Sequence, residues 1–297
     1  MKICFSEEWD KSFICWITKL LRTFVDEGSV TFVKQDESPD LMLASIWRVH
    51  KFINGVRTVL VSNENWNMWF PLMGLNRYEA VLGICPPPLG YGMPDPSQFI
   101  PYPWAALWFN ATIPELYAAR ERLLQQPKTK FCCFVSSSCI TGDLSDARVK
   151  MFHIINDWKP VDAGGSMCNN VERVPYGPND IIDNSSHYAN VSLSVLEWIA
   201  QYKYMICFEN SIASGYITEK PWQCWLSGTV PIYNGGCVDG LNQDAIINAS
   251  NADSVVPQLE YLEEHQDLYE VKRRSQMAEP LSLKPFEDKF RSMILEK

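Results

Sequence analysis

The sequence has 297 residues, 46% of them hydrophobic, and a formal net charge of −9 at pH 7. This length and apolar content suffice for two cores of about 150 residues each, so we expect a folded two-domain protein. The acidic charge argues against nucleic acid as the main partner, because a protein that binds a phosphate backbone needs a basic surface. A single nucleotide is compatible with it, since that ligand needs only a few local cations.

Short apolar runs alternate with amphipathic segments along the chain, a pattern that predicts α/β architecture with parallel sheets covered by helices on both faces. In the first half we expect a helix over 11–25 and strands over 1–5, 30–33, 41–45, 58–62 and 80–84. Residues 86–103, rich in Pro and Gly, are predicted to form a long loop, and residues 114–124 a helix. In the second half we expect strands over 131–135, 204–208 and 229–233, and helices over 145–157, 191–201, 252–264, 268–277 and 285–295.

The polar stretch Gln125-Gln126-Pro127-Lys128 is the predicted boundary between two domains. It divides the chain into an N-terminal domain, residues 1–126, and a C-terminal domain, residues 127–280. The remaining residues, 281–297, are expected to form a helix that packs back on the first domain.

No targeting or membrane segment is recognisable in the sequence. Glu7 and Glu8 stand where a signal peptide has a basic start and an apolar core. No run approaches the roughly 18 apolar residues of a membrane-spanning helix. We therefore expect a soluble, cytoplasmic protein without a membrane span. Its 10 cysteines are then expected to stay reduced, and they lack the paired C-x-x-C spacing of a zinc site.

Polar residues gather between the last two predicted strands. Glu209 and Asn210 follow the first of these strands, where the carboxyl end of a parallel strand opens into a crevice. Thr218 is placed to cap the helix that follows it. Glu219 and Lys220 then lie in the first turn, where free N–H groups and the helix dipole favour a phosphate. The pattern therefore predicts a site for a phosphorylated ligand.

This segment resembles the signature of the α-1,3/4-fucosyltransferases, glycosyltransferase family 10. In that family a strand ending in Phe-Glu-Asn-Ser is followed by Tyr-Val/Ile-Thr-Glu-Lys, a helix, and then Gly-Thr-Val/Ile-Pro-Val/Ile-Tyr. Residues 208–211, 216–220 and 228–233 match these elements, and Pro221 stands where the family usually has Ile or Leu. The resemblance implies two facing Rossmann-like domains of the GT-B type. Without a leading anchor, the chain is similar to the bacterial or viral members.

A second stretch extends the resemblance over residues 130–170. Arg148 opens a predicted helix, and residues 161–165 match the family's Val-Asp-x-Gly-Gly turn. Taken alone, Arg148 also fits a solvated helix arginine, but the resemblance assigns it to the donor diphosphate, to which Arg presents a bidentate fork. Glycine in the turn lets the backbone approach a ligand closely. The donor-binding residues that the resemblance implies are Arg148, Gly164, Gly165, Asn169, Glu209, Asn210, Tyr216, Thr218, Glu219 and Lys220.

Two carboxylates are the catalytic candidates, Glu64 and Glu219. Glu64 follows the strand expected over 58–62, and this strand end resembles the one that carries the family's proposed catalytic carboxylate. Its neighbours Asn63, Asn65 and Trp66 depart from the family's Glu-Ser-Pro form. The resemblance implies that Glu64 takes the proton of the acceptor hydroxyl. Glu219 would hold fucose hydroxyls or the positive charge that develops on the sugar ring.

The resemblance implies an inverting fucosyltransferase that moves L-fucose from GDP-fucose to a hydroxyl of an oligosaccharide or glycoconjugate, in α-1,3 or α-1,4 linkage. Because no Asp-x-Asp motif is present, we expect side-chain cations to neutralise the diphosphate, no required cofactor or metal site, and at most modest stimulation by divalent ions. Two alternatives stay open: a transferase of this architecture for another sugar nucleotide, and a catalytically silent glycan-binding relative. A P-loop enzyme is disfavoured, because no G-x-x-x-x-G-K-S/T loop is present.

Overall fold

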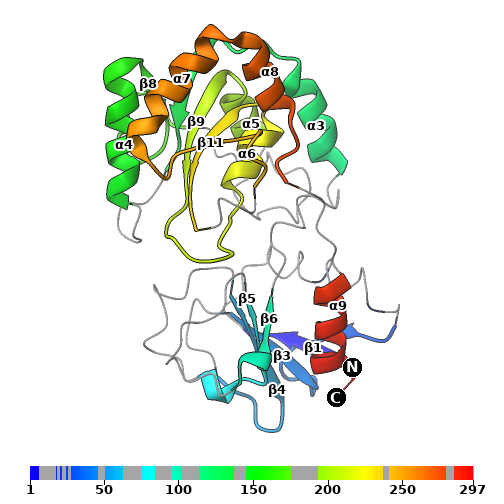
Figure 1. Cartoon of the computed structure of the whole chain (residues 1–297). Coiled ribbons are helices and arrows are strands. Elements are labelled where there is room, and N and C mark those ends of the chain that lie inside the picture. Colours follow the sequence, from blue (N-terminus) through cyan, green and yellow to red (C-terminus); the bar gives the residue numbers. More distant parts are fainter. Residues whose placement is uncertain are drawn as a thin grey trace. The chain divides into compact units, whose positions relative to one another are not determined.

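The structure, a computed structural model, describes residues 1–6, 18, 21, 25, 28–45, 51–62, 75–83, 95–101, 114–136, 145–174, 193–236, 241–278 and 284–296. The chain forms two compact units (Figure 1). Unit 1 comprises Met1–Ala106, Asn184–Tyr188 and Ser282–Lys297, and unit 2 comprises Leu107–Asp183 and Ala189–Leu281. Among the helices in the described part of the chain, none has the length and apolar character needed to cross a membrane.

Unit 1 is built on a parallel six-stranded sheet in the order β2-β1-β3-β4-β5-β6. Its strands are β1 (Lys2–Phe5), β2 (Thr31–Phe32), β3 (Leu41–Ser45), β4 (Arg57–Ser62), β5 (Ala80–Gly83) and β6 (Phe99–Pro101), with the 3-10 turns η3 (Leu75–Arg77) and η4 (Pro96–Gln98) between them. All five residues of β3 are buried, and all of β4 except its first residue. Such continuous burial is typical of central parallel strands, and it confirms the strands predicted from the apolar runs 41–45 and 58–62.

The loop predicted over 86–103 is wrong in its last part, because β6 forms there. Val81 lies opposite Phe99 and Leu82 opposite Ile100, in parallel register. The Pro and Gly content of the segment outweighed this short apolar run in the prediction. Pro101 is tolerated because β6 is an edge strand, where a missing N–H need not break the ladder. Of the helix predicted over 11–25, the structure describes only isolated positions.

The C-terminal segment of the chain packs within unit 1. The helix α9 (Lys284–Phe290) contacts β6 and continues into the π-helical turn η8 (Arg291–Leu295). Arg57, at the start of β4, donates to the carbonyl oxygen of Ile294 at 3.0 Å and pairs with Glu79 at 2.6 Å. One guanidinium on β4 thereby binds both the C-terminal π-helical turn and Glu79, the residue that precedes β5.

Unit 2 contains a second parallel sheet, in the order β11-β10-β9-β7-β8. Its strands are β7 (Lys130–Phe134), β8 (Val161–Ala163), β9 (Tyr202–Phe208), β10 (Val230–Asn234) and β11 (Ile247–Asn248). Its helices are α3 (Pro114–Leu124), α4 (Ser145–Trp158), α5 (Leu193–Ile199), α6 (Lys220–Leu226), α7 (Val255–Glu264), which follows the 3-10 turn η7 (Ala252–Ser254), and α8 (Gln266–Arg274). Figure 1 shows α4 and α7 on one side of the sheet and α3, α5 and α6 on the other, so both faces are covered as predicted.

The central strand β9 positions the polar residues of the signature. It pairs with β7 on one side and with β10 on the other. Phe208, the last residue of β9, lies opposite Asn234, the last residue of β10. The two strands therefore end together, and the chain that leaves β9 passes beside the end of β10.

Unit 2 begins earlier in the chain than the predicted boundary after residue 126, because α3 packs on α5 and α6. Leu123 of α3 is fully buried. The guanidinium of Arg120 lies 3.9 Å from the ring centroid of Trp225 on α6 and donates to its carbonyl oxygen. This packing places α3 in the same core as the second sheet.

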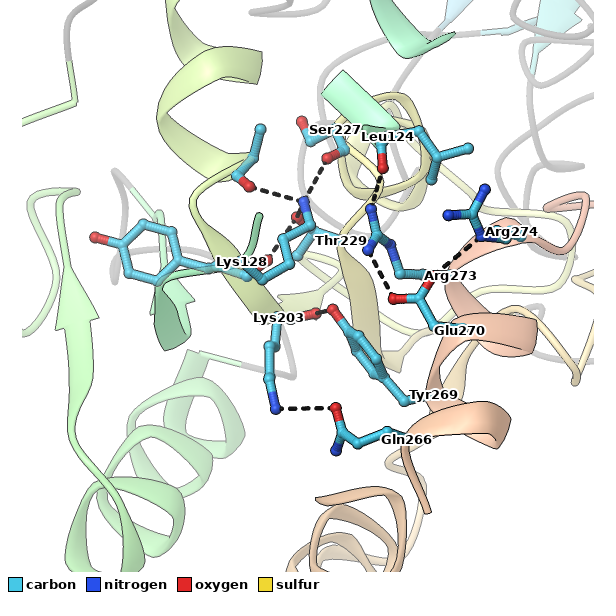
Figure 2. Close-up of polar contacts among 12 residues, drawn as sticks. Leu124, Lys128, Lys203, Ser227, Thr229, Gln266, Tyr269, Glu270, Arg273 and Arg274 are labelled. Atoms are coloured by element: carbon cyan, nitrogen blue, oxygen red, sulfur yellow. Dashed lines mark hydrogen bonds and ion pairs between the residues drawn. The ribbon is translucent and has the colours of Figure 1, made fainter. Parts of the chain in front are cut away.

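Lys128, between α3 and β7, binds the ends of two helices (Figure 2). Its ammonium donates to the carbonyl oxygens of Ala200, just after α5, at 2.8 Å and of Ser227, just after α6, at 2.7 Å, and to Thr229 Oγ1 at 3.2 Å. Carbonyls at a helix C-terminus lack intrahelical partners and carry the negative end of the dipole, so a cation suits them. Burial, reinforced by the nearby charge of Arg273, lowers the pKa of Lys128 to about 7.

Arg273, on α8, makes the same kind of contact at the end of a third helix (Figure 2). Its guanidinium donates to the carbonyl oxygen of Leu124, the last residue of α3, and pairs with Glu270 at 2.8 Å. Lys128 and Arg273 thus bind the C-terminal ends of α3, α5 and α6. These ends lie at the amino edge of the strands, opposite the carboxyl edge where β9 ends.

Candidate active site

Glu209, the first residue after β9, is the centre of the polar cluster. Its backbone N–H donates to the carbonyl oxygen of Asn234 at 2.9 Å, which continues the pairing of β9 with β10. Its side chain is fully buried, and one carboxylate oxygen accepts hydrogen bonds from the Thr218 amide at 2.8 Å and from Tyr233 Oη at 3.4 Å. The other oxygen accepts from Thr218 Oγ1 at 2.7 Å and from Lys220 Nζ at 3.3 Å. A buried carboxylate requires such compensation, and here protein donors supply it.

Thr218 does not cap α6, so that prediction is wrong. The N-cap residue is Glu219, and its side chain makes no capping hydrogen bond. The hydroxyl of Thr218 donates to Glu209 instead and accepts from Lys220 Nζ at 2.8 Å. The helix start therefore serves to bring Thr218 and Lys220 to the end of β9.

Lys220 is the cation of the cluster with a partly exposed side chain. Its ammonium lies 3.3 Å from Glu209 Oε2 and 3.6 Å from Glu219 Oε1. Desolvation alone lowers the pKa of Lys220, but the carboxylates of Glu219 and Glu209 outweigh it, so its pKa is raised above the ordinary lysine value. The ammonium is therefore charged throughout the neutral pH range.

Arg148 reaches the same strand end from α4. Its guanidinium donates to the carbonyl oxygen of Phe208 at 2.9 Å, to Asn210 Oδ1 at 2.6 Å and to Ser136 Oγ at 3.4 Å. The side chain is buried, so it is not the solvated helix arginine that the sequence also allowed. Desolvation lowers the pKa of Arg148, and the nearby Glu209 carboxylate opposes that shift. Two cations, Arg148 and Lys220, thus meet at the end of one strand.

Tyr216 lies on the turn between β9 and α6. Its N–H donates to the carbonyl oxygen of Ala213 at 3.0 Å, and its side chain is fully buried. Gly215 before it has φ +81°, a left-handed conformation that glycine adopts without strain. Gly236 passes against this turn so closely that an added Cβ would lie 2.0 Å from the Ala213 carbonyl oxygen. The turn is therefore clamped by the chain that leaves β10.

The glycines after β8 are required by contacts within the protein. A Cβ on Gly165 would lie 2.3 Å from the carbonyl oxygen of Ser136, and a Cβ on Gly164 would lie 2.7 Å from a methyl group of Val174. Asn169 supports the turn, since its amide donates to the carbonyl oxygens of Ala163 at 3.1 Å and Val171 at 3.0 Å. Contact with a ligand at these three predicted donor-binding positions stays a prediction.

The structure brings together most of the predicted site residues of unit 2. Arg148, Glu209, Asn210, Thr218, Glu219 and Lys220 form one connected set of contacts. Glu64, the other catalytic candidate, lies outside the described residues. In the part of the chain that the structure describes, no group of three or more His, Cys, Asp or Glu side chains is arranged to hold a metal ion.

Tyr233 is a member of the cluster that the sequence prediction missed. It belongs to the Gly-Thr-Val-Pro-Ile-Tyr part of the signature, and its hydroxyl faces Glu209. Its position in the sequence could have indicated this role. Tyr233 lies next to the last residue of β10, and β10 is the strand beside β9. A polar group at that place was bound to lie near the end of β9.

The two parallel α/β units have the fold of a known class of transferase. A solved structure of an α1,3-fucosyltransferase with GDP-fucose matches 99% of this chain and 90% of its own chain, with a TM-score of 0.66 and 19% sequence identity. At this identity the likeness concerns the fold, and that fold is the GT-B type of glycosyltransferase.

The family follows from the sequence of unit 2. Residues 125–272 match the family model described as glycosyltransferase family 10 (fucosyltransferase), C-terminal region. Through this region the chain belongs to glycosyltransferase family 10. The resemblance drawn from the Phe-Glu-Asn-Ser and Thr-Glu-Lys elements is thereby confirmed, since both lie within the matched residues.

Named relatives match part of the chain. The alpha-(1,3)-fucosyltransferase FucT of Helicobacter pylori is 29% identical over 147 residues, which cover 48% of this chain and 26% of the relative. The GDP-fucose protein O-fucosyltransferase 3 of Gallus gallus is 31% identical over 123 residues, which cover 39% of this chain and 23% of the relative. The chain thus spans about a quarter of the length of each.

Proposed function

We propose that the chain transfers L-fucose from GDP-fucose to a hydroxyl of an acceptor glycan, with inversion at the anomeric carbon and in α-1,3 or α-1,4 linkage. The observation that carries the proposal is the meeting of Arg148 and Lys220 at the end of β9. Two cations at the carboxyl end of a parallel sheet, where such folds bind nucleotides, suit a nucleoside diphosphate. Family membership supports fucose as the sugar.

Transfer breaks the bond between C1 of fucose and the diphosphate oxygen while the acceptor oxygen bonds to C1 from the opposite face. Negative charge grows on the departing GDP, and the ammonium of Lys220 and the guanidinium of Arg148 would stabilise it. Both groups are held in place before the reaction, which is the condition for effective electrostatic catalysis. Glu64 would take the proton of the acceptor hydroxyl.

The remaining groups would orient the sugar and the nucleotide. The carboxylate of Glu219 lies 3.6 Å from Lys220 Nζ, so it is placed beside the proposed diphosphate and can face fucose hydroxyls or the positive ring of the transition state. Asn210 would line the donor pocket, together with the turn that holds Gly164, Gly165 and Asn169, while the fully buried Tyr216 would support this pocket from within the fold. In this proposal unit 2 binds the donor and unit 1 binds the acceptor. The two cations take the part of a metal, so no cofactor is required.

A second candidate differs in the acceptor. The likeness to a protein named as a GDP-fucose protein O-fucosyltransferase favours a serine or threonine hydroxyl of a polypeptide as the acceptor. The donor chemistry of unit 2 would be unchanged. Two further alternatives follow from the sequence. A transferase for another sugar nucleotide would differ from the proposed enzyme in its donor, and a catalytically silent glycan-binding relative would show no turnover.

One series of measurements separates these candidates. Calorimetric titration with GDP, UDP and CMP tests the donor, and we expect tight binding of GDP alone. Equal affinity for UDP would overturn the choice of guanosine nucleotide. GDP-fucose is then incubated with a glycan array and with a peptide array that displays serine and threonine. We expect fucosylated glycans; fucose on peptides would favour the second candidate. GDP binding without hydrolysis or transfer would identify a silent relative.

A further inference from the structure

We propose that Glu209 is a positioning residue that sets the places of Lys220 and Arg148, and that its carboxylate acts on the donor diphosphate only through these two cations. The inference rests on the proposed function and deepens it. It assigns to Glu209 a role different from direct contact with the donor, which the sequence implied.

The hydrogen-bonding capacity of Glu209 is taken up by the protein. An ionised carboxylate only accepts hydrogen bonds and has about four lone-pair sites. Four donors face these sites: the amide and hydroxyl of Thr218, the ammonium of Lys220 and the hydroxyl of Tyr233. A sugar or phosphate group would have to displace one of them.

The chain also closes over the Glu209 side chain. A Cβ built on Gly235 would lie 2.8 Å from Glu209 Cγ and 2.4 Å from Tyr233 Oη. Even a methyl group is too large at this position, and the Glu209 side chain has no exposed surface. Glu209 therefore has no path to direct contact with a ligand.

Lys220 is oriented by a closed triangle of hydrogen bonds. Its ammonium donates to Thr218 Oγ1 at 2.8 Å and to Glu209 Oε2 at 3.3 Å, while the Thr218 hydroxyl donates to the same Oε2 at 2.7 Å. Both contacts hold the ammonium from its buried side. The side chain keeps 20% of its surface exposed, and we place the anion at this exposed part, beside the Glu219 carboxylate, which lies 3.6 Å from Nζ.

Arg148 depends on Glu209 through the backbone. Its guanidinium binds the residues directly before and after Glu209, the carbonyl of Phe208 and the side chain of Asn210. The course of the backbone between these acceptors is set by the bond from the Glu209 N–H to Asn234 and by the bonds of the carboxylate to Thr218. One buried carboxylate thus anchors both cations.

If Glu209 positions the two cations, loss of its carboxylate should change GDP affinity in one direction, and if it acts only through its charge, in the opposite direction. Replacing it by an amide makes the cluster more positive, and on charge alone GDP should bind more tightly. If Glu209 positions the cations, GDP should bind more weakly, because an amide offers one acceptor oxygen and turns an N–H₂ group toward other donors. The sign of the change therefore decides between the two roles.

The experiment compares Glu209→Gln with Thr218→Val and with a matched control, using calorimetry with GDP. We expect Glu209→Gln to weaken GDP binding about tenfold, the effect of one lost charge-assisted hydrogen bond. Thr218→Val removes the bridging hydroxyl without changing any charge, and we expect a loss of about fivefold. The control is Glu263→Gln: Glu263 binds Lys203 at 2.8 Å, Lys159 at 3.1 Å and the hydroxyl of Tyr204 at 3.2 Å in the same unit. It should leave GDP affinity within about twofold of wild type.

Guanosine, titrated by ligand-observed NMR, distinguishes positioning of the cations from a general structural role. A general structural defect would lower the affinity for guanosine as well as for GDP. Guanosine has no phosphate, so its affinity should be unchanged in Glu209→Gln. GDP binding that is equal to or tighter than wild type overturns the inference, and so does an equal loss for GDP and guanosine. If circular dichroism shows that Glu209→Gln does not fold, Thr218→Val decides by the same criteria. Wild-type protein that binds no GDP overturns the proposed function, an outcome distinct from failure of the inference alone.

Discussion

Glu209 and Thr218 are joined by two hydrogen bonds, from the Thr218 amide at 2.8 Å and from its hydroxyl at 2.7 Å. The pair closes the loop between β9 and α6, so that the first residue of α6, Lys220, lies beside the end of the strand. The same strand end binds Arg148 from α4. The geometry of the proposed donor site therefore depends on a contact that is buried in the protein.

Removing either cation should weaken the proposed donor binding and slow transfer. Lys220→Ala and Arg148→Ala each take away one group that would stabilise charge on GDP, and we expect turnover to fall roughly 10²–10³-fold. Loss of the Arg148 guanidinium also removes its hydrogen bonds to Phe208 and Asn210. Steady-state kinetics with GDP-fucose and calorimetry with GDP measure both effects. Wild-type values in either variant would remove that residue from the site.

Replacing Glu64 should separate chemistry from donor binding. Glu64→Gln is expected to retain GDP affinity while transfer falls roughly 10²–10⁴-fold, because an amide cannot accept the acceptor's proton. The acidic limb of the wild-type pH–rate profile should disappear in this variant.

Glu219→Gln is the comparison for Glu64→Gln. Since Glu219 lies beside Lys220, its loss should disturb donor binding and turnover together. If Glu64→Gln transfers fucose normally and Glu219→Gln abolishes transfer without affecting binding, the two roles are reversed.

Lys128 should make stability depend on pH above neutrality. Its pKa is lowered to about 7 in the folded protein, while an unfolded lysine titrates near 10.4. Between these two pKa values the unfolded chain binds more protons than the folded chain, so the free energy of unfolding rises with pH over this range. Below pH 7 Lys128 is protonated in both states, and its contribution to the free energy of unfolding is constant. Urea denaturation of wild type and Lys128→Met at pH 6 and pH 9 measures it. From pH 6 to pH 9 the free energy of unfolding of the wild type should increase relative to that of Lys128→Met. An equal pH dependence of the two proteins would contradict the prediction.

The two glycines after β8 should differ in their tolerance of alanine. Gly165→Ala places a methyl group against the backbone of Ser136, which cannot move without shifting the end of β7. Gly164→Ala meets side-chain atoms of Val174 and Trp198, which can adjust. We expect Gly165→Ala to lose about 1–3 kcal/mol of unfolding free energy, the usual cost of overpacking, and Gly164→Ala to lose less. Thermal denaturation measures the stability of both variants. A greater loss of stability in Gly164→Ala than in Gly165→Ala would show that the backbone of the turn adjusts more easily than the side chains of Val174 and Trp198.

Chelation should have little effect on transfer. If Lys220 and Arg148 neutralise the departing diphosphate, EDTA should lower turnover by less than about tenfold. Initial rates are compared with and without EDTA and after addition of Mg²⁺ or Mn²⁺. Complete loss with EDTA, restored by one of these ions, would assign the neutralising role to a metal.

Much of the arrangement could be predicted from the sequence, because it is recorded in local order along the chain. Apolar runs identified β3, β4 and β9, since a buried parallel strand is a nearly continuous apolar run. The spacing of Glu209, Thr218 and Lys220 identified the strand end and the helix that follows it. These signals involve residues that are close together in the chain, and so they can be recognised from the sequence alone.

Only the tertiary structure decided which group each polar atom binds. The sequence placed Thr218 as a helix cap and Glu209 as a ligand contact, but folding buries Glu209 and turns the Thr218 hydroxyl toward it. Tyr233 joined the cluster because β10 lies beside β9, a neighbourhood that depends on strand order. A hydrogen bond forms with whichever partner the packing brings within about 3 Å, and that distance is set by the whole sheet.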